Sequence, residues 1–499
     1  MRTGRSLSSR LRSRILLALL ATAGVVSCAQ PATTSKPDPV TLRIGVAVPK
    51  TNEATSGVKS FVGNLLSEQL IGLGWDGRPV ARLASGKWSP DGLLLTLDLS
   101  KNLQFHDGMV IDAAFVKADL EKYLKSSLLN YKTVVALDAV GKDQLTIRLS
   151  RPEALLLADL SNFLLSHPSN PNIGTGPYRL LEGAPVRLAA FDKYYRGRPL
   201  TDFVEVHEFE EQRSSWAALM RGEIDAVHEI SPGAMDFVQA EGQTTVATFP
   251  FTRPYFISLF FNTRHPVLKA PSVRQALSYT VDRESLIKLG LNGQGIVAEG
   301  PIWPFHWAYS TAPKTYSRNV EAATLRLESA GLRMRKSAEP GQMPSRFHFR
   351  CLTVARYEKI ALALQKQLSE VGVDLDIQIV PGRDLVARMK SGDFDSVLME
   401  RTSGRSLVWT YFFFHSKVMS LGYSSADGIL DRLRTATADI DVRDAVSDFQ
   451  QVLYEDPPAI FIAWPQVARV VSTRFVVPEE KGRDVIASLS KWKAATAVK

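Results

Sequence analysis

The sequence predicts an α/β protein built from two lobes. The chain has 499 residues, and a single hydrophobic core seldom grows beyond about 250–300 residues, so more than one core is expected. Strand patterns dominate residues 178–206, and beyond residue 263 amphipathic helices alternate with apolar strands, the rhythm of an α/β lobe. Hydrophobic residues make up 45% and charged residues 22% of the chain, a composition typical of globular proteins.

The first half of the chain mixes strand and helix patterns. Alternating polarity predicts a strand over residues 41–48, and apolar residues from 61 to 73 recur at helical spacing. A helix is expected to begin at Asp112, a preferred N-cap residue, and to run to residue 128. Further strands are predicted over residues 93–99, 134–140, 144–150 and 223–230, with a helix over 212–220.

The second half begins with a strongly apolar strand over residues 255–263. An amphipathic helix follows from residue 272, and a second helix is expected to begin at Asp282. The remaining predicted helices cover residues 322–329, 356–371, 384–390 and 442–454, and the remaining strands cover 347–354, 373–380, 393–401 and 459–464.

The amino terminus has the pattern of an export signal. Residues 1–14 hold five arginines and no acidic residue, and residues 15–26 form an apolar run too short to span a bilayer. The run ends at Val25-Val26-Ser27-Cys28, which resembles a lipoprotein box, in which the cysteine thiolate takes up diacylglycerol. We expect residues 1–27 to be a signal peptide and residues 28–39 to be a lipidated Cys28 with a flexible tether. The alternative is an ordinary signal peptide with an incidental cysteine.

Charge and cysteine content exclude several classes of protein. The formal net charge of +9 owes much to the five arginines of the expected signal peptide, so a weakly basic mature protein gives no case for nucleic acid binding. The two cysteines are Cys28 and Cys351. Lipidation of Cys28 would leave no disulfide, and Cys351, in a predicted strand, is expected to be a small buried hydrophobe.

Catalytic, cofactor and metal motifs are not found. The eight histidines are scattered, with no pair at the i, i+4 spacing of a helical metal site. The turn Gly174–Tyr178 (GTGPY) lacks the Lys-Ser/Thr of a phosphate loop, and the sequence has no Gly-x-Ser-x-Gly motif. We therefore expect no enzyme activity, no cofactor and no metal centre.

Three strings, in this order, carry a resemblance to a known family. They are Leu103–Gly108 (LQFHDG), Gly174–Tyr178 (GTGPY) and Ser272–Ile287 (SVRQALSYTVDRESLI). Together they resemble the extracytoplasmic solute-binding proteins of bacterial ABC importers, family 5, the peptide/nickel-binding type. The resemblance extends from about residue 40 to about residue 474.

The resemblance implies a two-lobed periplasmic-binding-protein-like fold of type II, with an extra subdomain and a ligand cleft between the lobes. Carried over to this chain, lobe one covers residues 40–258 and 466–499, its subdomain covers about 64–172, and lobe two covers 259–465. Two crossings between lobes form a hinge, which permits closure over a ligand.

The function implied is capture of a peptide or peptide-like solute for delivery to the transmembrane subunits of an ABC permease. The protein is expected to be a monomer, lipid-anchored in the periplasm or on the outer cell-membrane surface. The alternative within the family is a nickel or metal-chelate binding protein. A regulatory sensor would need an amino-terminal DNA-binding domain, and the expected signal peptide occupies that place.

The stretch after residue 396 suggests an anionic solute. Peptide-binding relatives carry an aspartate here, which pairs with the ligand's α-ammonium, whereas Glu400 is the only acid between residues 396 and 426. Arg401 and Arg405 stand there instead, and guanidinium groups suit carboxylate or phosphate. We expect one of them to bind an anionic group of the ligand. The alternative is that both are surface arginines or pair with local acids.

Aromatic residues and one histidine complete the candidate site. Trp303, Trp409 and Tyr255 are candidates for covering ligand side chains, although such rings often belong to a core instead. His415 is a candidate contact to a metal chelate, as in nickel-binding relatives; the alternative is a structural histidine.

Overall fold

The computed structural model describes residues 38–47, 56–183, 185–231, 234, 245–335, 344–418, 422–478 and 482–495. The predicted signal peptide, Cys28 and most of the predicted tether lie outside the described residues. Residues 39–499 form one unit, and its architecture is given below.

A twelve-stranded mixed sheet extends through this unit. Its strand order is β16-β15-β17-β13-β18-β11-β1-β10-β9-β8, with β12 and β14 also paired to β18. The strands are β1 (Thr41–Ala47), β8 (Tyr178–Leu181), β9 (Val186–Ala190), β10 (Phe203–Phe209), β11 (Ala226–Ile230), β12 (Val246–Thr252), β13 (Tyr255–Phe261), β14 (Gly295–Val297), β15 (Phe347–Thr353), β16 (Val373–Ile379), β17 (Ser396–Thr402) and β18 (Ala459–Ser472).

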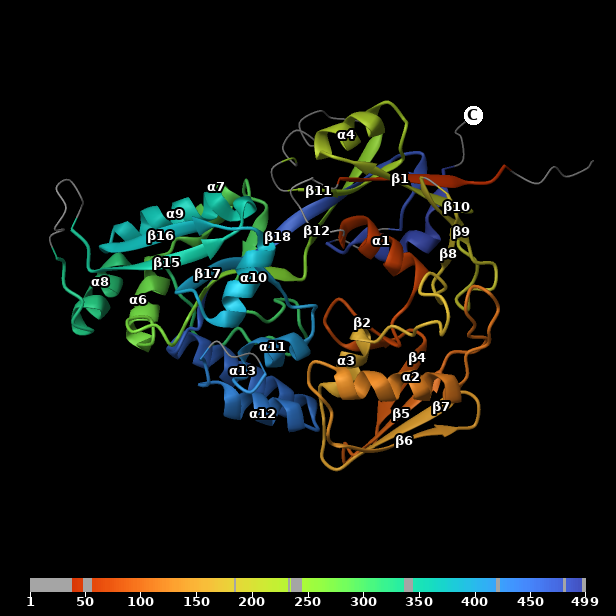
Figure 1. Ribbon diagram of the computed structural model, residues 1–499, viewed down its shortest axis with the longest axis horizontal. Helices are drawn as coiled ribbons and strands as arrows, with labels where there is room; N and C mark the ends of the chain where they lie inside the picture. The colour runs from red at the N-terminus through yellow and green to blue at the C-terminus, as the bar shows by residue number, and fades with distance from the viewer. Residues whose placement is uncertain are drawn as a thin grey trace, which may run out of the picture. The chain divides into compact units, whose positions relative to one another are not determined.

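The long strand β18 joins the two lobes of the α/β fold. Its first part pairs with β13 and β14, and its second part pairs with β11 and β12. The first lobe contains β11, β1, β10, β9 and β8, and the second contains β16, β15 and β17 (Figure 1), together with β13, which lies between β17 and β18 in the sheet. The sequence predicts a strand only to residue 464, whereas β18 continues to Ser472 because almost all of its side chains are buried in the cores of both lobes.

A second, four-stranded sheet belongs to the amino-terminal part of the chain. Its order is β4-β5-β7-β6, and α2 begins at the predicted N-cap, where the Asp112 side chain accepts a hydrogen bond from the Phe115 amide. This small sheet and its helices are β4 (Ala84–Trp88), β5 (Leu94–Leu99), β6 (Val134–Val140), β7 (Gln144–Leu149), α2 (Ala113–Ser126) and α3 (Leu156–Asp159).

The helix indicated by the spacing of apolar residues from 61 to 73 ends earlier than predicted. Helix α1 (Ser56–Leu66) stops at Leu66, and β2 (Ile71–Leu73) pairs instead with β3 (Pro79–Ala81). Leu70 is fully buried in the core that the small sheet shares. Tertiary burial, which the local period does not report, therefore overrides the helical pattern here.

Helices cover the second lobe. They are α6 (Pro271–Thr280), α7 (Arg283–Gly290), α8 (Val320–Ser329), α9 (Glu358–Ser369), α10 (Gly382–Ser391), α11 (Leu407–Phe414), α12 (Asp427–Thr435) and α13 (Asp439–Glu455); α4 (Gln212–Met220) lies on the first lobe. Asp282 caps α7, as predicted. The sequence pattern did not predict α11, because its run LVWTYFFF is apolar on every side and has no amphipathic period.

The carboxyl-terminal residues return to the first lobe. The short helix η3 (Val485–Lys491) contributes Val485 and Leu489 to the core that holds Leu42 and Ile44 of β1. The strands β19 (Phe475–Val476) and β20 (Lys493–Ala494) pair with each other.

One hydrophobic core joins the small sheet to the second lobe. It contains Leu97 of β5 and Val116 of α2 together with Phe260 of β13, Val408 of α11 and Phe449 of α13. A second core lies under α6, α7 and α9, within the second lobe. The domain limits predicted from the sequence (40–258 with 466–499, about 64–172, and 259–465) stay a prediction.

Cys351 lies in β15 and is fully buried, as a small hydrophobe should be. Burial raises the pKa of its thiol to about 12. Among the described residues, no helix combines the length and the apolar character needed to cross a membrane.

Candidate functional site

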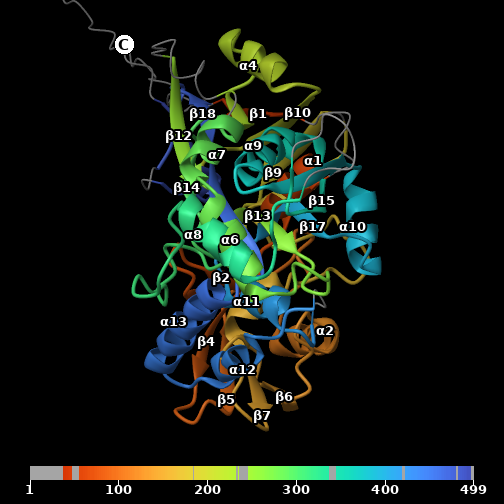
Figure 2. The same cartoon turned by 90° about the vertical axis from the view of Figure 1, so that its left-hand side faces the viewer.

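Residues 253–254 connect β12 to β13, and this connection is here called the crossing. The backbone amides of Ser403 and Gly404, just after β17, both donate to the carbonyl oxygen of Pro254, at 2.9 and 3.2 Å. The loop that carries Arg405 is therefore fixed against this crossing. Figure 2 shows β12, β14 and β18 running together.

Arg405 has an unusual backbone conformation. Its φ of 59° is left-handed, as is the φ of 56° at Gly404, and a non-glycine residue keeps such a conformation only when its surroundings impose it. Trp409 packs against Gly404, where a Cβ atom would lie 2.8 Å from the indole ring, and a Cβ atom at Gly77 would clash with the Arg405 carbonyl oxygen. The loop is thus held between α11 and the amino-terminal part of the chain.

The guanidinium of Arg405 is partly buried and makes no ion pair with the described residues. Within the part of the chain that the structure describes, its Nε atom is buried and has no hydrogen-bond acceptor. Burial lowers the pKa of Arg405, Asp484 opposes this effect, and the positive charges of Arg483 and Arg82 add to it. Leaving such a group unpaired is costly, so this side chain is suited to an anion.

Arg401 lies elsewhere, inside the second lobe. Its guanidinium carbon is 4.5 Å from the centre of the Phe260 ring and 4.8 Å from that of Phe413, and only 7% of the residue is exposed. Burial lowers the pKa of Arg401 to about 10. Glu400 faces the other side of β17, where it accepts a hydrogen bond from the Tyr357 hydroxyl at 2.9 Å, as strand alternation predicts.

A chain of ion pairs, here called the crossing network, runs from one lobe to the other. In order of contact its members are Asp484, Arg469 of β18, Glu229 of β11, Arg253, Glu400 of β17 and Arg356. The successive N···O distances are 2.7, 3.7, 3.7, 3.3 and 3.9 Å.

The network places its charges close to the loop of Arg405. Burial disfavours the charge of Arg253, but Glu400 and Glu229 outweigh it and raise the pKa of that arginine. Burial likewise works against Asp484, but Arg469 holds the pKa of this carboxyl below its ordinary value. Three arginines and three carboxylates balance one another in the network. Arg405, whose charge interacts with that of Asp484, is an additional cation.

Two of the predicted aromatic residues lie at the crossing, and one does not. Tyr255 is half-buried under the guanidinium of Arg253, at 4.8 Å, and Trp409 is half-buried against Phe413, with ring centres 5.7 Å apart. Trp303 is 1% exposed, and its indole nitrogen donates to the Trp75 carbonyl at 2.8 Å. The structure therefore places Trp303 in the core that joins the small sheet to the second lobe.

His415 is buried beside two aspartates. Its Nε2 atom lies 3.2 Å from Asp431 Oδ1, and its Nδ1 atom accepts a hydrogen bond from the Lys417 amide. Asp427 is 3.8 Å from Nδ1. Over the described residues, no group of three or more His, Cys, Asp or Glu side chains is arranged to hold a metal ion.

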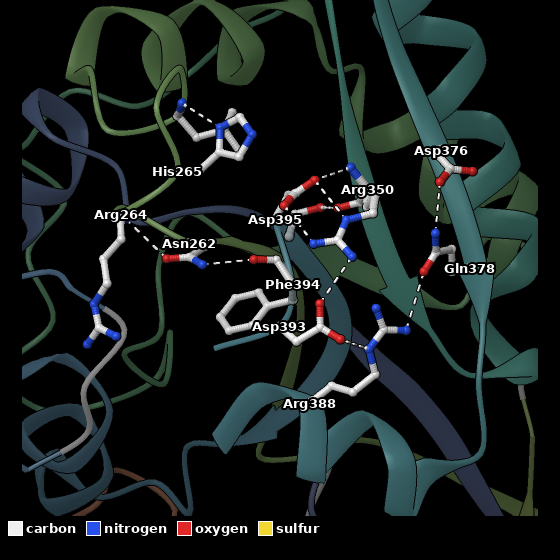
Figure 3. Close-up of polar contacts among 12 residues, drawn as sticks. Asn262, Arg264, His265, Arg350, Asp376, Gln378, Arg388, Asp393, Phe394 and Asp395 are labelled. Carbon is white, nitrogen blue, oxygen red and sulfur yellow. Dashed lines mark hydrogen bonds and ion pairs between the residues drawn. The ribbon is translucent and has the colours of Figure 1, made fainter. Parts of the chain in front are cut away.

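A separate polar cluster fixes α10 to the far end of β17 (Figure 3). Arg350 donates to both oxygens of Asp395 and to Asp393, at 3.1–3.2 Å. Arg388 of α10 donates to Asp393 at 2.9 Å and to Gln378 at 3.3 Å. Because these residues lie at the amino-terminal end of β17, opposite the crossing, we regard the cluster as structural.

Sequence reasoning missed most of the crossing network. Asp484, Arg469, Glu229 and Arg253 come from segments far apart in the chain, and none lies in a recognisable motif. The available signal was Arg253-Pro254, directly before the apolar strand predicted over residues 255–263.

Comparison with known proteins identifies the class. Residues 78–447 match the profile of the bacterial extracellular solute-binding proteins, family 5. The match covers most of the chain, and the chain belongs to this family.

Particular relatives bind different solutes. The chain is 29% identical over 319 residues to the oligopeptide-binding protein AppA of Bacillus subtilis, covering 59% of this chain and 56% of that protein. It is 24% identical over 431 residues to the dipeptide-binding protein of Escherichia coli, covering 76% and 79%. The crystal structure of NikZ from Campylobacter jejuni in complex with Ni(L-His) has the same fold, with a TM-score of 0.75 at 23% identity, covering 91% and 99%.

Proposed function

We propose that this protein is the extracytoplasmic solute-binding component of an ABC importer and that it captures a peptide or peptide-like solute with an anionic group. The family and the oligopeptide- and dipeptide-binding relatives support this function. The solute would lie between the lobes at the crossing network. Tyr255 and Trp409 would contact it there.

The position of Arg405 is the observation that supports an anionic group on the solute. Its guanidinium is partly buried and has no ion pair among the described residues. Charge-assisted bonds to a carboxylate or phosphate would supply the missing acceptors. Arg82 and Arg483 add positive potential, so an anion is favoured over an ammonium group. Arg401 is the second candidate for this role, but its guanidinium already lies between two aromatic rings.

Calorimetry with the natural solute tests this assignment. Native mass spectrometry of the freshly purified protein would identify a retained solute, which is then titrated into the solute-free protein. For Arg405→Gln we expect a loss of about 2–5 kcal/mol, which is roughly thirtyfold or more in affinity. Arg221→Gln is the control, because Arg221 is exposed and its one ion pair among the described residues is with Glu223. Binding by Arg405→Gln within about threefold of wild type would mean that Arg405 is not the anchor.

The remaining parts of the proposal concern place and partners. Cys28 would carry the lipid anchor, residues 28–39 would tether the protein to the membrane, and the permease would receive the solute from a monomer. The variant Cys28→Ser should be released from membranes or remain unprocessed. An unlipidated mature wild-type protein would refute the anchor.

A metal chelate is the second candidate solute. The observation in its favour is the shared fold with NikZ in complex with Ni(L-His). A chelate brings its own carboxylates, which Arg405 could hold, and His415 is the candidate protein ligand from the sequence. The same mass spectra decide between the two, because nickel has a distinct isotope pattern. A bound peptide without metal would exclude the chelate.

A further inference from the structure

A cavity outside the crossing network opens on the second lobe. It has a volume of about 200 Å³ and lies between α13 and the segment that follows β14. A more enclosed recess of about 20 Å³, lined by Arg283 of α7, adjoins it. Glu299, Lys314 and Gln450 line both spaces, so the two form one site. No member of the crossing network lines either space.

Arg283 is a cation without a carboxylate partner at this recess. Its Nε atom donates to the Phe461 carbonyl at 2.7 Å, and Nη1 donates to the carbonyls of Tyr316 and Ser278 at 3.2 and 3.5 Å. These acceptors are neutral. Among the described residues, no carboxylate lies within 4 Å of the guanidinium, and Nη2 makes no hydrogen bond.

The electrostatic balance of the site is positive. Burial lowers the pKa of Arg283 to about 10, and the carboxylate of Glu299 opposes this shift from a greater distance. Lys314 adds a second positive charge at the exposed rim. Two cations therefore face a single acidic side chain at this site.

We propose that this cavity is a second ligand site, which binds a small oxyanion, a carboxylate or phosphate, between Arg283 Nη2 and Lys314. The planar guanidinium of Arg283 is held in place by its three carbonyl acceptors, and this fixed orientation suits oxyanion recognition. The volume is below the roughly 300–1,000 Å³ of pockets for drug-sized ligands, so the ligand is small.

The site has a structural route to the contact between the small sheet and the second lobe. The segment from β14 to Lys314 lines the cavity and also carries Trp303, which donates to the Trp75 carbonyl. An anion bound between Arg283 and Lys314 ties Lys314, at the end of this segment, to α7. We expect anion binding to restrain the segment that carries Trp303.

The test is a titration of the full mature protein with sodium phosphate and, separately, sodium acetate, at constant ionic strength maintained with sodium chloride. Thermal unfolding and calorimetry follow binding. We expect a saturable rise in the unfolding temperature for at least one of the two anions, and the stronger response identifies the oxyanion class. Arg283→Gln should abolish the response.

Exposed charges provide variants that keep the test valid if Arg283→Gln does not fold. Lys314→Gln should weaken the anion by about threefold to fivefold, and Glu299→Gln should strengthen it by a similar factor, because a competing carboxylate is removed. Lys288→Gln, an exposed change on α7, should leave binding unaltered. No saturable response in the wild-type protein, or equal responses in Lys314→Gln, Glu299→Gln and Lys288→Gln, would overturn the proposal.

Discussion

The ion pair between Arg434 of α12 and Glu153, which follows β7, is predicted to hold the second lobe against the small sheet. Arg434 donates from Nε to Glu153 Oε2 at 2.5 Å and from Nη2 to Glu153 Oε1 at 3.2 Å. The side chains are 10% and 0% exposed. The guanidinium also lies over the rings of Tyr131 and Tyr411, at 5.5 and 5.2 Å. This pair is buried and bidentate.

Removing one partner should therefore be expensive. Arg434→Met leaves the Glu153 carboxylate buried with a hydrogen bond from the Thr133 hydroxyl at 2.8 Å and with Arg151 at 3.7 Å. Breaking a buried pair in this way costs about 3–5 kcal/mol. Because both charges are removed together, the double variant Arg434→Met/Glu153→Gln should lose less than the sum of the single losses, with a coupling energy of about 0.5–3 kcal/mol.

The assay is equilibrium urea unfolding of wild type, both single variants and the double variant, followed by circular dichroism and by tryptophan fluorescence. Arg432→Met is the matched control on the same helix, because its partner is Asp448 and both side chains are more than half exposed. This control should change stability by only about 0–1 kcal/mol. If Arg434→Met costs no more than Arg432→Met, the reasoning from burial is refuted.

Three further predictions follow from single residues. Partial burial favours the neutral form of Asp395, but Arg350 outweighs it and holds the pKa of that carboxyl below its ordinary value. The Arg350–Asp395 pair therefore stabilises the folded protein fully above the pKa of Asp395 in the unfolded chain. This stabilisation is lost as the pH falls through the lower pKa of Asp395 in the folded protein. The loss caused by Arg350→Gln in thermal unfolding should therefore shrink in acid, and a constant loss would contradict this. Gly77→Ala should destabilise more than Gly108→Ala by about 1–3 kcal/mol, because both have positive φ but only Gly77 packs against the loop after β17; equal losses in urea unfolding would refute the contact. Cys351 should resist alkylation in the folded protein and react only on unfolding, because burial raises its thiol pKa to about 12; rapid labelling of folded protein would disprove this.

The local elements were largely predictable from the sequence. Helix α4 was predicted at its observed limits, and the caps at Asp112 and Asp282 were correct. These features depend on neighbouring residues, through hydrogen bonds between a side chain and nearby amides. The failures at β2 and α11 have the opposite cause, since burial by distant segments decides both.

The family, and with it the two-lobed fold, was evident from three short strings in a fixed order, and the profile match over residues 78–447 confirms it. The candidate site was only partly predictable. Arg405, Tyr255 and Trp409 were selected from the sequence and lie at the crossing, whereas Trp303 lies in a core and Arg401 between two rings.

The sequence by itself determined the charge of the stretch from residue 396 to residue 426, because replacement of the expected acid by arginines is visible in the residues alone. Only the tertiary structure decided where the two arginines lie. Arg401 and Arg405 are four residues apart and chemically identical, but alternation along β17 and the left-handed turn at Arg405 send them into different surroundings. Whether a guanidinium is compensated depends on groups such as Asp484 and Arg82, which folding brings near from distant segments.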